Sequence, residues 1–405
     1  MTVTFRHAFL IDGNGGEPLE DATLTVAEGE IRDIRPGAAG TRAPGGRVID
    51  LRGKTLMPGL IDAHVHPGNV EWRLSDTAKL APAVYVHRVS RTLETDLALG
   101  FTSLRDAAGV DRGFREAVDR GLIRGPRLFL SVTPIARREP GVTPEPRNSL
   151  GIAPEACDGP EDIRQAVQRT LQRGADQIKV FADGEVVSQS RSDRTRPGQA
   201  RFDVEDLRAA VETASSSGVY VMAHVYGPGA IRNCLDAGVR SIEHGNLMDG
   251  ETAEMLAARG AYYVPTLTVY DLLLRGEGME LDAFTAEKLQ IVGNKGREAL
   301  EMAWRAGARI GSGSDIIGPL QHLKGRELAL KAEVMGPMGA IVSATRTNAE
   351  LMGISDRIGT LDPGKRADLI VLDGSPLEDM RLFERGLERV VLVMKDGKIL
   401  KELPA

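Results

Sequence analysis

The chain of 405 residues contains only two cysteines, Cys157 and Cys234, and they stand in unrelated sequence contexts. Two isolated thiols exclude a disulfide framework and argue against a metal site built from thiolates. The chain also lacks any run approaching the roughly 18 apolar residues that cross a membrane. Its first residues show no basic stretch followed by an apolar one, as a secretory signal would. We therefore expect a cytoplasmic protein with no membrane partner.

The chain also has no excess of positive charge. The 51 Lys and Arg residues are outnumbered by 57 Asp and Glu residues, which gives a net charge of −6. Nucleic-acid-binding chains usually carry a basic surface, so we expect no nucleic-acid partner. At this length a single core rarely suffices, which predicts either a large barrel with an appendage or several domains. Whether copies associate into a homo-oligomer is left open.

Both ends of the chain are rich in short β-type segments. Residues 1–58 alternate in strand-length bursts separated by Gly, Pro or acidic residues. Residues 356–405 behave in the same way, with Asp-Gly turns at 373–374 and 396–397. Because chain termini often lie close together, we expect both ends to combine into one small β-sandwich domain.

Between the two ends, in residues 59–355, strands alternate with amphipathic helical stretches. Eight strands are predicted, at residues 60–66, 101–107, 127–134, 177–183, 219–226, 240–246, 261–270 and 309–315. Eight β/α repeats of this total length predict an α/β fold of the (β/α)8 TIM-barrel type. Active sites of such barrels lie at the carboxyl ends of the strands.

A pair of histidines, His64 and His66, stands at the end of the first predicted strand. Side chains alternate between the faces of a strand, so both imidazoles point the same way and could begin a metal site. Taken alone, the pair is equally well explained by two histidines on a solvated strand. Other predicted strands, however, also carry possible metal ligands toward their ends, and these are His224, His244 and Asp315, while the strand at 177–183 offers Lys179. Four of the seven histidines thus fall at strand ends, which predicts a metal centre there.

These segments resemble the amidohydrolase superfamily over essentially the whole chain. The resemblance rests on PGLIDAHVH at 58–66, GFTSLRDAAG at 100–109, IKVFADG at 178–184, AHVYG at 223–227, SIEHGN at 241–246, GSD at 313–315 and RIGTLDPGKRADLIVLDGSP at 357–376. The chain is most similar to the branch that contains imidazolonepropionase-like enzymes and bacterial Xaa-Pro dipeptidases.

The resemblance implies a centre of two divalent ions and a lysine carboxylated by CO2. One ion would be held by His64, His66 and Asp315, the other by His224 and His244, and the Lys179 carbamate would bridge them. A carbamate is anionic, and the apolar neighbours of Lys179 favour the neutral amine that forms it. For this lysine alone, a side chain that reaches the surface is the alternative. Zn²⁺ is the expected ion, with Mn²⁺, Co²⁺ or Fe²⁺ also suited to these ligands.

The expected reaction is hydrolysis of a C–N bond in a small substrate such as a dipeptide, an N-acyl amino acid or a cyclic amide. A hydroxide bridging the ions would attack the carbonyl, and Asp315 would carry its proton to the leaving amine. Tyr226 is a candidate for binding the substrate carbonyl, as in the resembled branch, or a tyrosine that merely packs at the rim. No organic cofactor is required. Alternatives are hydrolysis of a carbamate, urea, lactone or organophosphate-type ester, and a non-catalytic assembly role, which has no need of six converged ligands.

The segment after the third predicted strand departs from the resembled branch. Relatives carry a Thr-Gly-Gly-His-Gly type loop there, whereas this chain has SVTPIARREPGVTPEP, with Arg137 and Arg138. Arginines 137, 138, 191, 194 and 196 could together bind a carboxylate of the substrate. The alternative is that all five are solvated residues of surface loops. On the second strand we expect Arg105 and Asp106 to form a structural ion pair. Residues 264, 266 and 270 either line an apolar pocket or fill the core.

Overall fold

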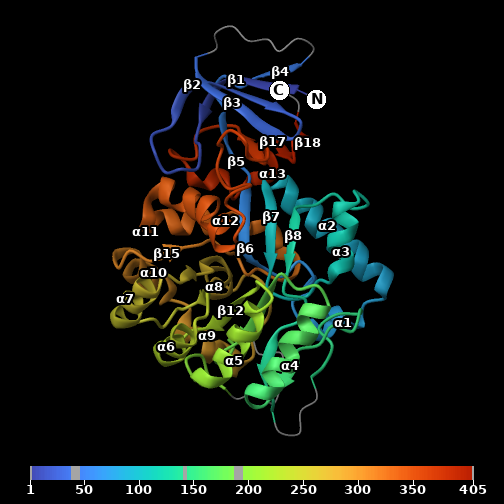
Figure 1. Ribbon diagram of the computed structural model, residues 1–405, viewed down its shortest axis with the longest axis vertical. Helices are drawn as coiled ribbons and strands as arrows, with labels where there is room; N and C mark the ends of the chain where they lie inside the picture. The colour runs from blue at the N-terminus through green and yellow to red at the C-terminus, as the bar shows by residue number, and fades with distance from the viewer. Residues whose placement is uncertain (1, 38–45, 140–143, 187–194, 404–405) are drawn as a thin grey trace.

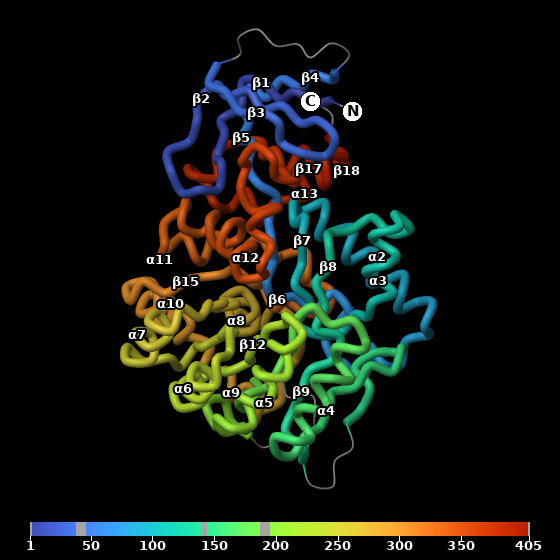
Figure 2. Tube along the Cα trace, in the orientation of Figure 1, coloured from blue at the N-terminus to red at the C-terminus, as the bar shows by residue number. Residues whose placement is uncertain are grey.

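The computed structural model describes residues 2–37, 46–139, 144–186 and 195–403, so arginines 191 and 194 lie outside the described residues. Figure 1 shows two parts: strands from both chain ends, coloured blue and red, lie together at one end of the molecule, and the parallel strands with their helices fill the rest. The tube in Figure 2 shows both termini within the same terminal part.

Strands from the two ends of the chain share one sheet, in the order β18-β17-β16-β5-β1-β2-β3, with β4 paired to β1. Their bounds are β1 (Thr2–Leu10), β2 (Leu19–Ala27), β3 (Glu30–Pro36), β4 (Arg47–Asp50), β5 (Thr55–Pro58), β16 (Leu369–Leu372), β17 (Val390–Lys395) and β18 (Lys398–Glu402). The two ends meet where β5 pairs antiparallel with β16 and Met57 lies opposite Ile370.

This composite sheet differs in detail from the expected sandwich of two sheets. Its strands are hydrogen-bonded into a single branched sheet, because β1 pairs with β4 along its first half and with β5 at its end. Apolar residues of both halves, among them Phe5, Leu24, Leu369 and Leu392, pack into one core. The alternating pattern of the segments therefore predicts the strands correctly. It does not predict that they form one sheet, because that depends on β1 pairing with both β4 and β5.

The middle of the chain forms two parallel sheets, β6-β7-β8 and β10-β9-β11-β12-β13-β14-β15. Their strands are β6 (Leu60–Val65), β7 (Phe101–Asp106), β8 (Arg127–Leu130), β9 (Ile135–Arg137), β10 (Glu155–Cys157), β11 (Gln177–Phe181), β12 (Tyr220–Val225), β13 (Ser241–His244), β14 (Tyr262–Val264) and β15 (Arg309–Ile310). Backbone hydrogen bonds join the sheets outside these ladders, from Ala63 N to Ser312 O at 2.8 Å and from Asp176 N to Leu130 O at 2.7 Å. The strands thus follow a barrel-like course without one continuous ladder.

All eight predicted strands are shorter than expected, and the seventh and eighth are shortened most. The seventh, predicted for residues 261–270, ends at Val264 because Thr266 adopts a left-handed backbone with φ of 50° and a helix begins at Leu267. The eighth, predicted for residues 309–315, keeps only its first two residues as a strand. Two further short strands, β9 and β10, lie after the third predicted strand, where the sequence predicts none. The other six strands agree with the prediction at their starts to within one residue.

Helices cover the outside of the parallel strands (Figure 1). Ile163, Leu207 and Ile231, one from each of three successive helices, belong to the same core as the strand residues Ile178 and Val221. The bounds are α1 (Leu74–Lys79), α2 (Pro82–Ala98), α3 (Arg112–Asp119), α4 (Gly159–Gln172), α5 (Val204–Ser215), α6 (Pro228–Ala237), α7 (Gly250–Arg259), α8 (Leu267–Leu274), α9 (Ala283–Val292), α10 (Gly296–Arg305), η1 (Gly318–Leu323), α11 (Arg326–Ser343), α12 (Arg346–Leu351), η2 (Met380–Leu382) and α13 (Gly386–Arg389). Within the described ranges, no helix has the length and apolar character needed to span a membrane.

Candidate metal centre

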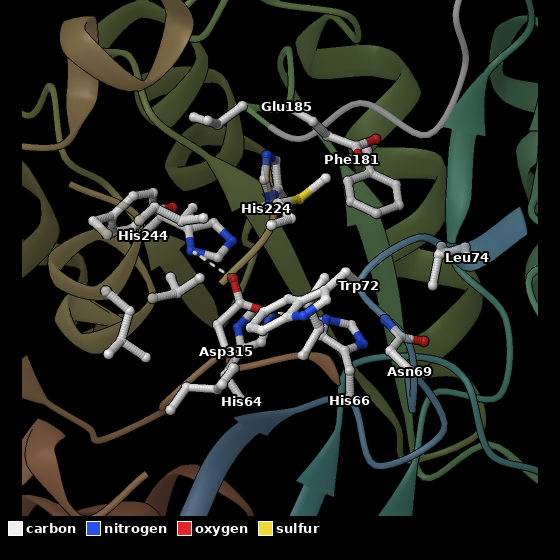
Figure 3. A pocket seen from close by; sticks show the side chains of 18 of the residues that line it. His64, His66, Asn69, Trp72, Leu74, Phe181, Glu185, His224, His244 and Asp315 are labelled. Carbon is white, nitrogen blue, oxygen red and sulfur yellow. Dashed lines mark ion pairs between the residues drawn. The ribbon is translucent and has the colours of Figure 1, made fainter. Parts of the chain in front are cut away.

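His64 and His66 point into the same pocket from the end of β6, as strand alternation predicts (Figure 3). Each ring is held through Nδ1: that of His64 lies 2.7 Å from Glu243 Oε2, and that of His66 lies 2.7 Å from Ala108 O. The Nε2 atoms face Asp315 Oδ1, at 3.5 Å from His64 and 3.3 Å from His66. These contacts present both Nε2 atoms and one carboxylate to a common point.

His224 and His244 enter the pocket from the ends of β12 and β13, with their ring centroids 4.4 Å apart. His244 has a left-handed backbone with φ of 72°, and its Nδ1 lies 2.8 Å from Thr266 Oγ1. The Nε2 atoms of both rings are buried and have no hydrogen-bond partner among the described residues. An orphaned buried polar atom is costly, so these nitrogens are suited to a bound cation.

Lys179 lies on β11 and brings its Nζ to 3.2 Å from Nε2 of His64. The residue is only 1% exposed. Burial lowers the pKa of the Lys179 amine to about 8, although the carboxylates of Glu243 and Asp315 act in the opposite direction. About a tenth of the amine is therefore neutral at pH 7, and the neutral amine is the form that reacts with CO2.

The titratable groups of the pocket are poised in the forms that bind metal ions. Burial lowers the pKa of His64 and His224 well below the usual histidine value, and the nearby charges of Lys179 and His244 add to the effect. Burial likewise lowers the pKa of His244 to about 4. Burial would raise the pKa of the Asp315 carboxyl, but the surrounding imidazoles lower it overall. Neutral imidazoles and an ionised carboxylate are metal ligands.

Several donor atoms also lie as close together as the ligands of a metal centre. One ligand atom from each of His64, His244 and Asp315 falls within 4.8 Å of the others. This nitrogen and oxygen donor set, supported by the orphaned nitrogens, fits a divalent transition-metal ion such as Zn²⁺.

A buried carboxylate that the sequence did not single out supports this centre. Arg105 pairs with Glu243, at 2.8 Å between Nη2 and Oε1, and both side chains are 0% exposed. The expected Arg105–Asp106 ion pair is therefore wrong, because adjacent strand residues point to opposite faces. The carboxylate of Asp106 is buried instead, and neither of its oxygens has a hydrogen-bond partner among the described residues. Glu243 in turn orients His64, as carboxylates commonly do behind a metal-binding histidine.

A second carboxylate, Asp62, connects the two segments that carry His64 and Asp315. It accepts hydrogen bonds from the backbone N–H groups of His64 and Ser314, at 3.2 and 3.1 Å, and from the Ser314 hydroxyl at 2.7 Å. Behind it, Nζ of the buried Lys324 lies 3.7 Å from Asp62 and 2.7 Å from Asp96. By binding both His64 and Ser314, the Asp62 carboxylate holds the two segments that carry His64 and Asp315 at a fixed distance.

Tyr226 lies in the pocket, as the sequence predicts. Its ring stacks on His244, at 5.4 Å between centroids and 26° between planes, and its hydroxyl lies 2.8 Å from that of Tyr270. Tyr270 also lines the pocket, although it projects from α8 rather than from the predicted strand. Val264, by contrast, is buried in a separate hydrophobic core.

The two arginines proposed for substrate binding lie outside the pocket. Arg137 forms ion pairs with Asp158 and Asp206, and Arg138 pairs with Asp158 and Asp162. Arg196 is likewise paired, with Glu287. Among the described residues, the arginine that lines the pocket is Arg147, which like Arg137 lies in the segment after the third predicted strand. No periodicity in that segment distinguishes one arginine from another, so the sequence offers no signal for it.

Comparison with known proteins identifies the family. Residues 55–400 match the Amidohydrolase family along most of the chain. The chain belongs to this family. Ochratoxinase of Aspergillus niger is 32% identical to this amidohydrolase, over 98% of this chain and 87% of that protein. Imidazolonepropionase of Deinococcus radiodurans is 27% identical, over 88% of this chain and 86% of its own.

The same relationship holds among solved structures. The crystal structure of a prolidase complexed with N-methylphosphonate-L-proline superposes with a TM-score of 0.92 at 34% identity, and all of both chains is covered. The resemblance to the imidazolonepropionase and Xaa-Pro dipeptidase branch is thereby confirmed. The relatives also place the fold of this amidohydrolase among TIM barrels with a small additional domain.

Proposed function

We propose that this amidohydrolase is a binuclear metal-dependent hydrolase of a C–N bond in a small substrate. The observation that carries the proposal is the convergence of six side chains on one buried pocket, where two imidazole nitrogens have no partner among the described residues. The six are His64, His66, Lys179, His224, His244 and Asp315. Ochratoxinase, imidazolonepropionase and prolidase among its relatives support hydrolysis of a C–N bond.

Each ligand has a specific place in the proposal. His64, His66 and Asp315 would hold one ion, His224 and His244 the other, and Lys179 would stand between them as a carbamate. Two bound divalent ions supply a water molecule of lowered pKa and polarise the carbonyl of the substrate. Zn²⁺ is the ion best matched to this mixture of imidazole and carboxylate donors, and Mn²⁺, Co²⁺ or Fe²⁺ could replace it.

The protein's own groups then move the protons. Asp315, which the surrounding imidazoles keep ionised, accepts a proton from the attacking water and delivers it to the nitrogen of the leaving amine. The water oxygen forms a bond to the acyl carbon as the C–N bond breaks, so an acid and an amine are released. The Tyr226 hydroxyl, held by Tyr270, donates a hydrogen bond to the oxygen of the scissile carbonyl.

Hydrolysis assays with matched amide, ester and carbamate substrates test this proposal. We expect the amides to be cleaved, chelation to abolish the activity, and about two metal ions per chain after growth with ample metal and bicarbonate. Asp315→Asn and His244→Asn should each lower kcat by at least about 10²-fold. His322→Asn is the matched control, since His322 is exposed and does not line this pocket.

Two results would contradict the proposal. Activity confined to esters or carbamates would move the reaction to the alternative bonds. Protein that takes up no metal under these conditions would favour a non-catalytic assembly role instead.

A further inference from the structure

The pocket beside the candidate metal centre is apolar over much of its wall. Trp72, Leu74, Phe181, Met279 and Ile316 contribute to it, next to the metal-binding groups. Figure 3 shows Phe181 and Leu74 on the side of the pocket away from His244. Such a wall would bury an apolar group of the substrate, because it removes that group from water.

One arginine, Arg147, is set into this wall. Its guanidinium carbon lies 5.1 Å from the centre of the Phe181 ring. Its Nε is buried and has no hydrogen-bond partner in the part of the chain that the structure describes. Arginine stays charged in proteins, so a buried donor of this kind without a partner is costly. A negatively charged group on the substrate would remove that cost.

Arg147 is better suited than Arg137 or Arg138 to bind a negatively charged group of the substrate. Burial lowers the pKa of its guanidinium, and the nearby Glu185 carboxylate opposes the shift. Arg137 and Arg138, by contrast, each form two ion pairs on the surface. Among the described lining residues, Arg147 is the one arginine that can present a planar pair of donors to a carboxylate.

A substrate carboxylate bound by Arg147 would lie close to the scissile bond. The Phe181 ring that lies beneath its guanidinium is also 5.1 Å from the ring of His224, and Phe181 follows Lys179 by two residues on β11. The guanidinium is therefore separated from a candidate metal ligand by a single aromatic ring. In an amide of an α-amino acid, the carboxylate carbon is two bonds from the scissile nitrogen, so the two groups must be recognised at neighbouring places.

We propose that Arg147 binds the free α-carboxylate of an amino acid that forms the amine side of the scissile amide, while the Trp72 and Phe181 wall receives its apolar side chain. This inference rests on the proposed amide hydrolysis and names its substrate class: N-acyl or N-aminoacyl derivatives of apolar α-amino acids. Water adds to the acyl carbon, the C–N bond breaks, and the nitrogen leaves with one proton from the water. The products are a carboxylic acid and the free amino acid.

A series of acylated glycine, leucine and phenylalanine substrates tests the proposal, each prepared as the free acid and as the C-terminal carboxamide. Release of the acyl acid by the metal-loaded wild-type protein is measured by chromatography. We expect free acids of leucine and phenylalanine to be preferred over their carboxamides by about 10²-fold in kcat/KM. Arg147→Gln should lower kcat/KM for the free acids by about 10²-fold and change that for the carboxamides by less than about 3-fold. Arg147→Lys should fall between the two, because it keeps the charge and loses the planar fork.

Matched controls and a binding measurement separate recognition from folding. Arg137→Gln and Arg138→Gln should leave the preference for free acids unchanged. L-Phenylalanine, a product, should raise the Tm of the wild type and not that of Arg147→Gln. Equal cleavage of acids and carboxamides by the wild type, or loss of both in Arg147→Gln, would overturn the role of Arg147 and leave amide hydrolysis standing. Failure of the metal-loaded wild type to cleave any substrate of the series would count against the proposed function itself.

Discussion

Nδ1 of His64 lies 2.7 Å from Oε2 of Glu243, and the two side chains are 1% and 0% exposed. In this contact the Nδ1–H group of His64 donates to the Glu243 carboxylate, which leaves the Nε2 lone pair directed toward Asp315. Glu243→Gln should weaken metal binding by about 10- to 100-fold, because the amide is a poorer acceptor and leaves Arg105 without its counter-charge. Competition with a chelator measures the affinity. Glu254→Gln on the exposed face of α7 is the control, and an unchanged affinity in Glu243→Gln would refute the orienting role.

Lys179 should take up CO2 in a pH-dependent way. Its pKa, lowered by burial to about 8, means that the reactive neutral amine becomes more abundant as the pH rises from 7 to 9. At constant dissolved ¹³CO2, the carbamate signal of the metal-free protein in ¹³C NMR should grow over this range and then level off. Lys179→Met should abolish the signal, whereas Lys79→Met, at an exposed position, should keep it. A signal that persists in Lys179→Met would show that another amine is modified.

Gly313 keeps the first and last strands of the site close together. A Cβ added there would lie 2.5 Å from Cβ of His64 and 2.9 Å from its backbone nitrogen. Gly313→Ala should therefore destabilise the protein by about 1–3 kcal/mol and reduce its metal content, because His64 and Asp315 are forced apart. Urea unfolding and metal analysis check both effects. Gly250→Ala, where nothing lies within 4 Å of an added Cβ, should retain stability and metal, and equal behaviour of the two variants would contradict the prediction.

Asp183 should make the stability of the protein depend on pH. The carboxylate accepts backbone hydrogen bonds from Tyr226, Gly227 and Gly198, at 2.7, 3.0 and 3.1 Å, yet burial raises its pKa to about 7. Between about pH 4 and pH 7 the folded chain holds a proton that the unfolded chain has lost. The contribution of this group to stability therefore falls as the pH rises through that window, by at most about 1.4 kcal/mol per pH unit.

Comparison with Asp183→Asn isolates this contribution. The free energy of unfolding of the wild type minus that of the variant should decrease from pH 4 to pH 7 and stay constant above. Asp119→Asn, at an exposed position on α3, is the matched control for the substitution itself. A flat difference for Asp183→Asn would show that the carboxyl titrates alike in the folded and unfolded chains.

The part of the site that could be predicted from the sequence is the part governed by local geometry. Alternation along a strand places His64 and His66 on one face, and the start of each strand is marked by its apolar run. His244 and Asp315 reach the same pocket through left-handed residues, with φ of 72° and 53°, that no periodicity reveals. Their positions at the ends of predicted strands were nevertheless sufficient to group them.

The missed features depend on contacts between distant parts of the chain. Arg105 and Glu243 are separated by 138 residues and meet only inside the barrel-like interior, so the adjacent Asp106 was the wrong partner. Arg147 lines the pocket and Arg137 does not, because the backbone between them follows an irregular path. No periodic pattern in the local sequence predicts that path. The early end of the seventh strand has a similar cause, since the left-handed Thr266 also holds His244 through its hydroxyl.

The pairing of β5 with β16 has a consequence for the order of events during synthesis. β5 ends at Pro58, six residues before His64, and one of its edges is completed by Leu369–Leu372, from near the other end of the chain. While the ribosome is still making the last third of the protein, the strand that leads into His64 and His66 lacks this neighbour, and Asp315 and its Ser314 support arrive late as well. We therefore expect metal ions to be loaded after translation rather than during it, so that cells short of metal would accumulate a complete but unloaded chain.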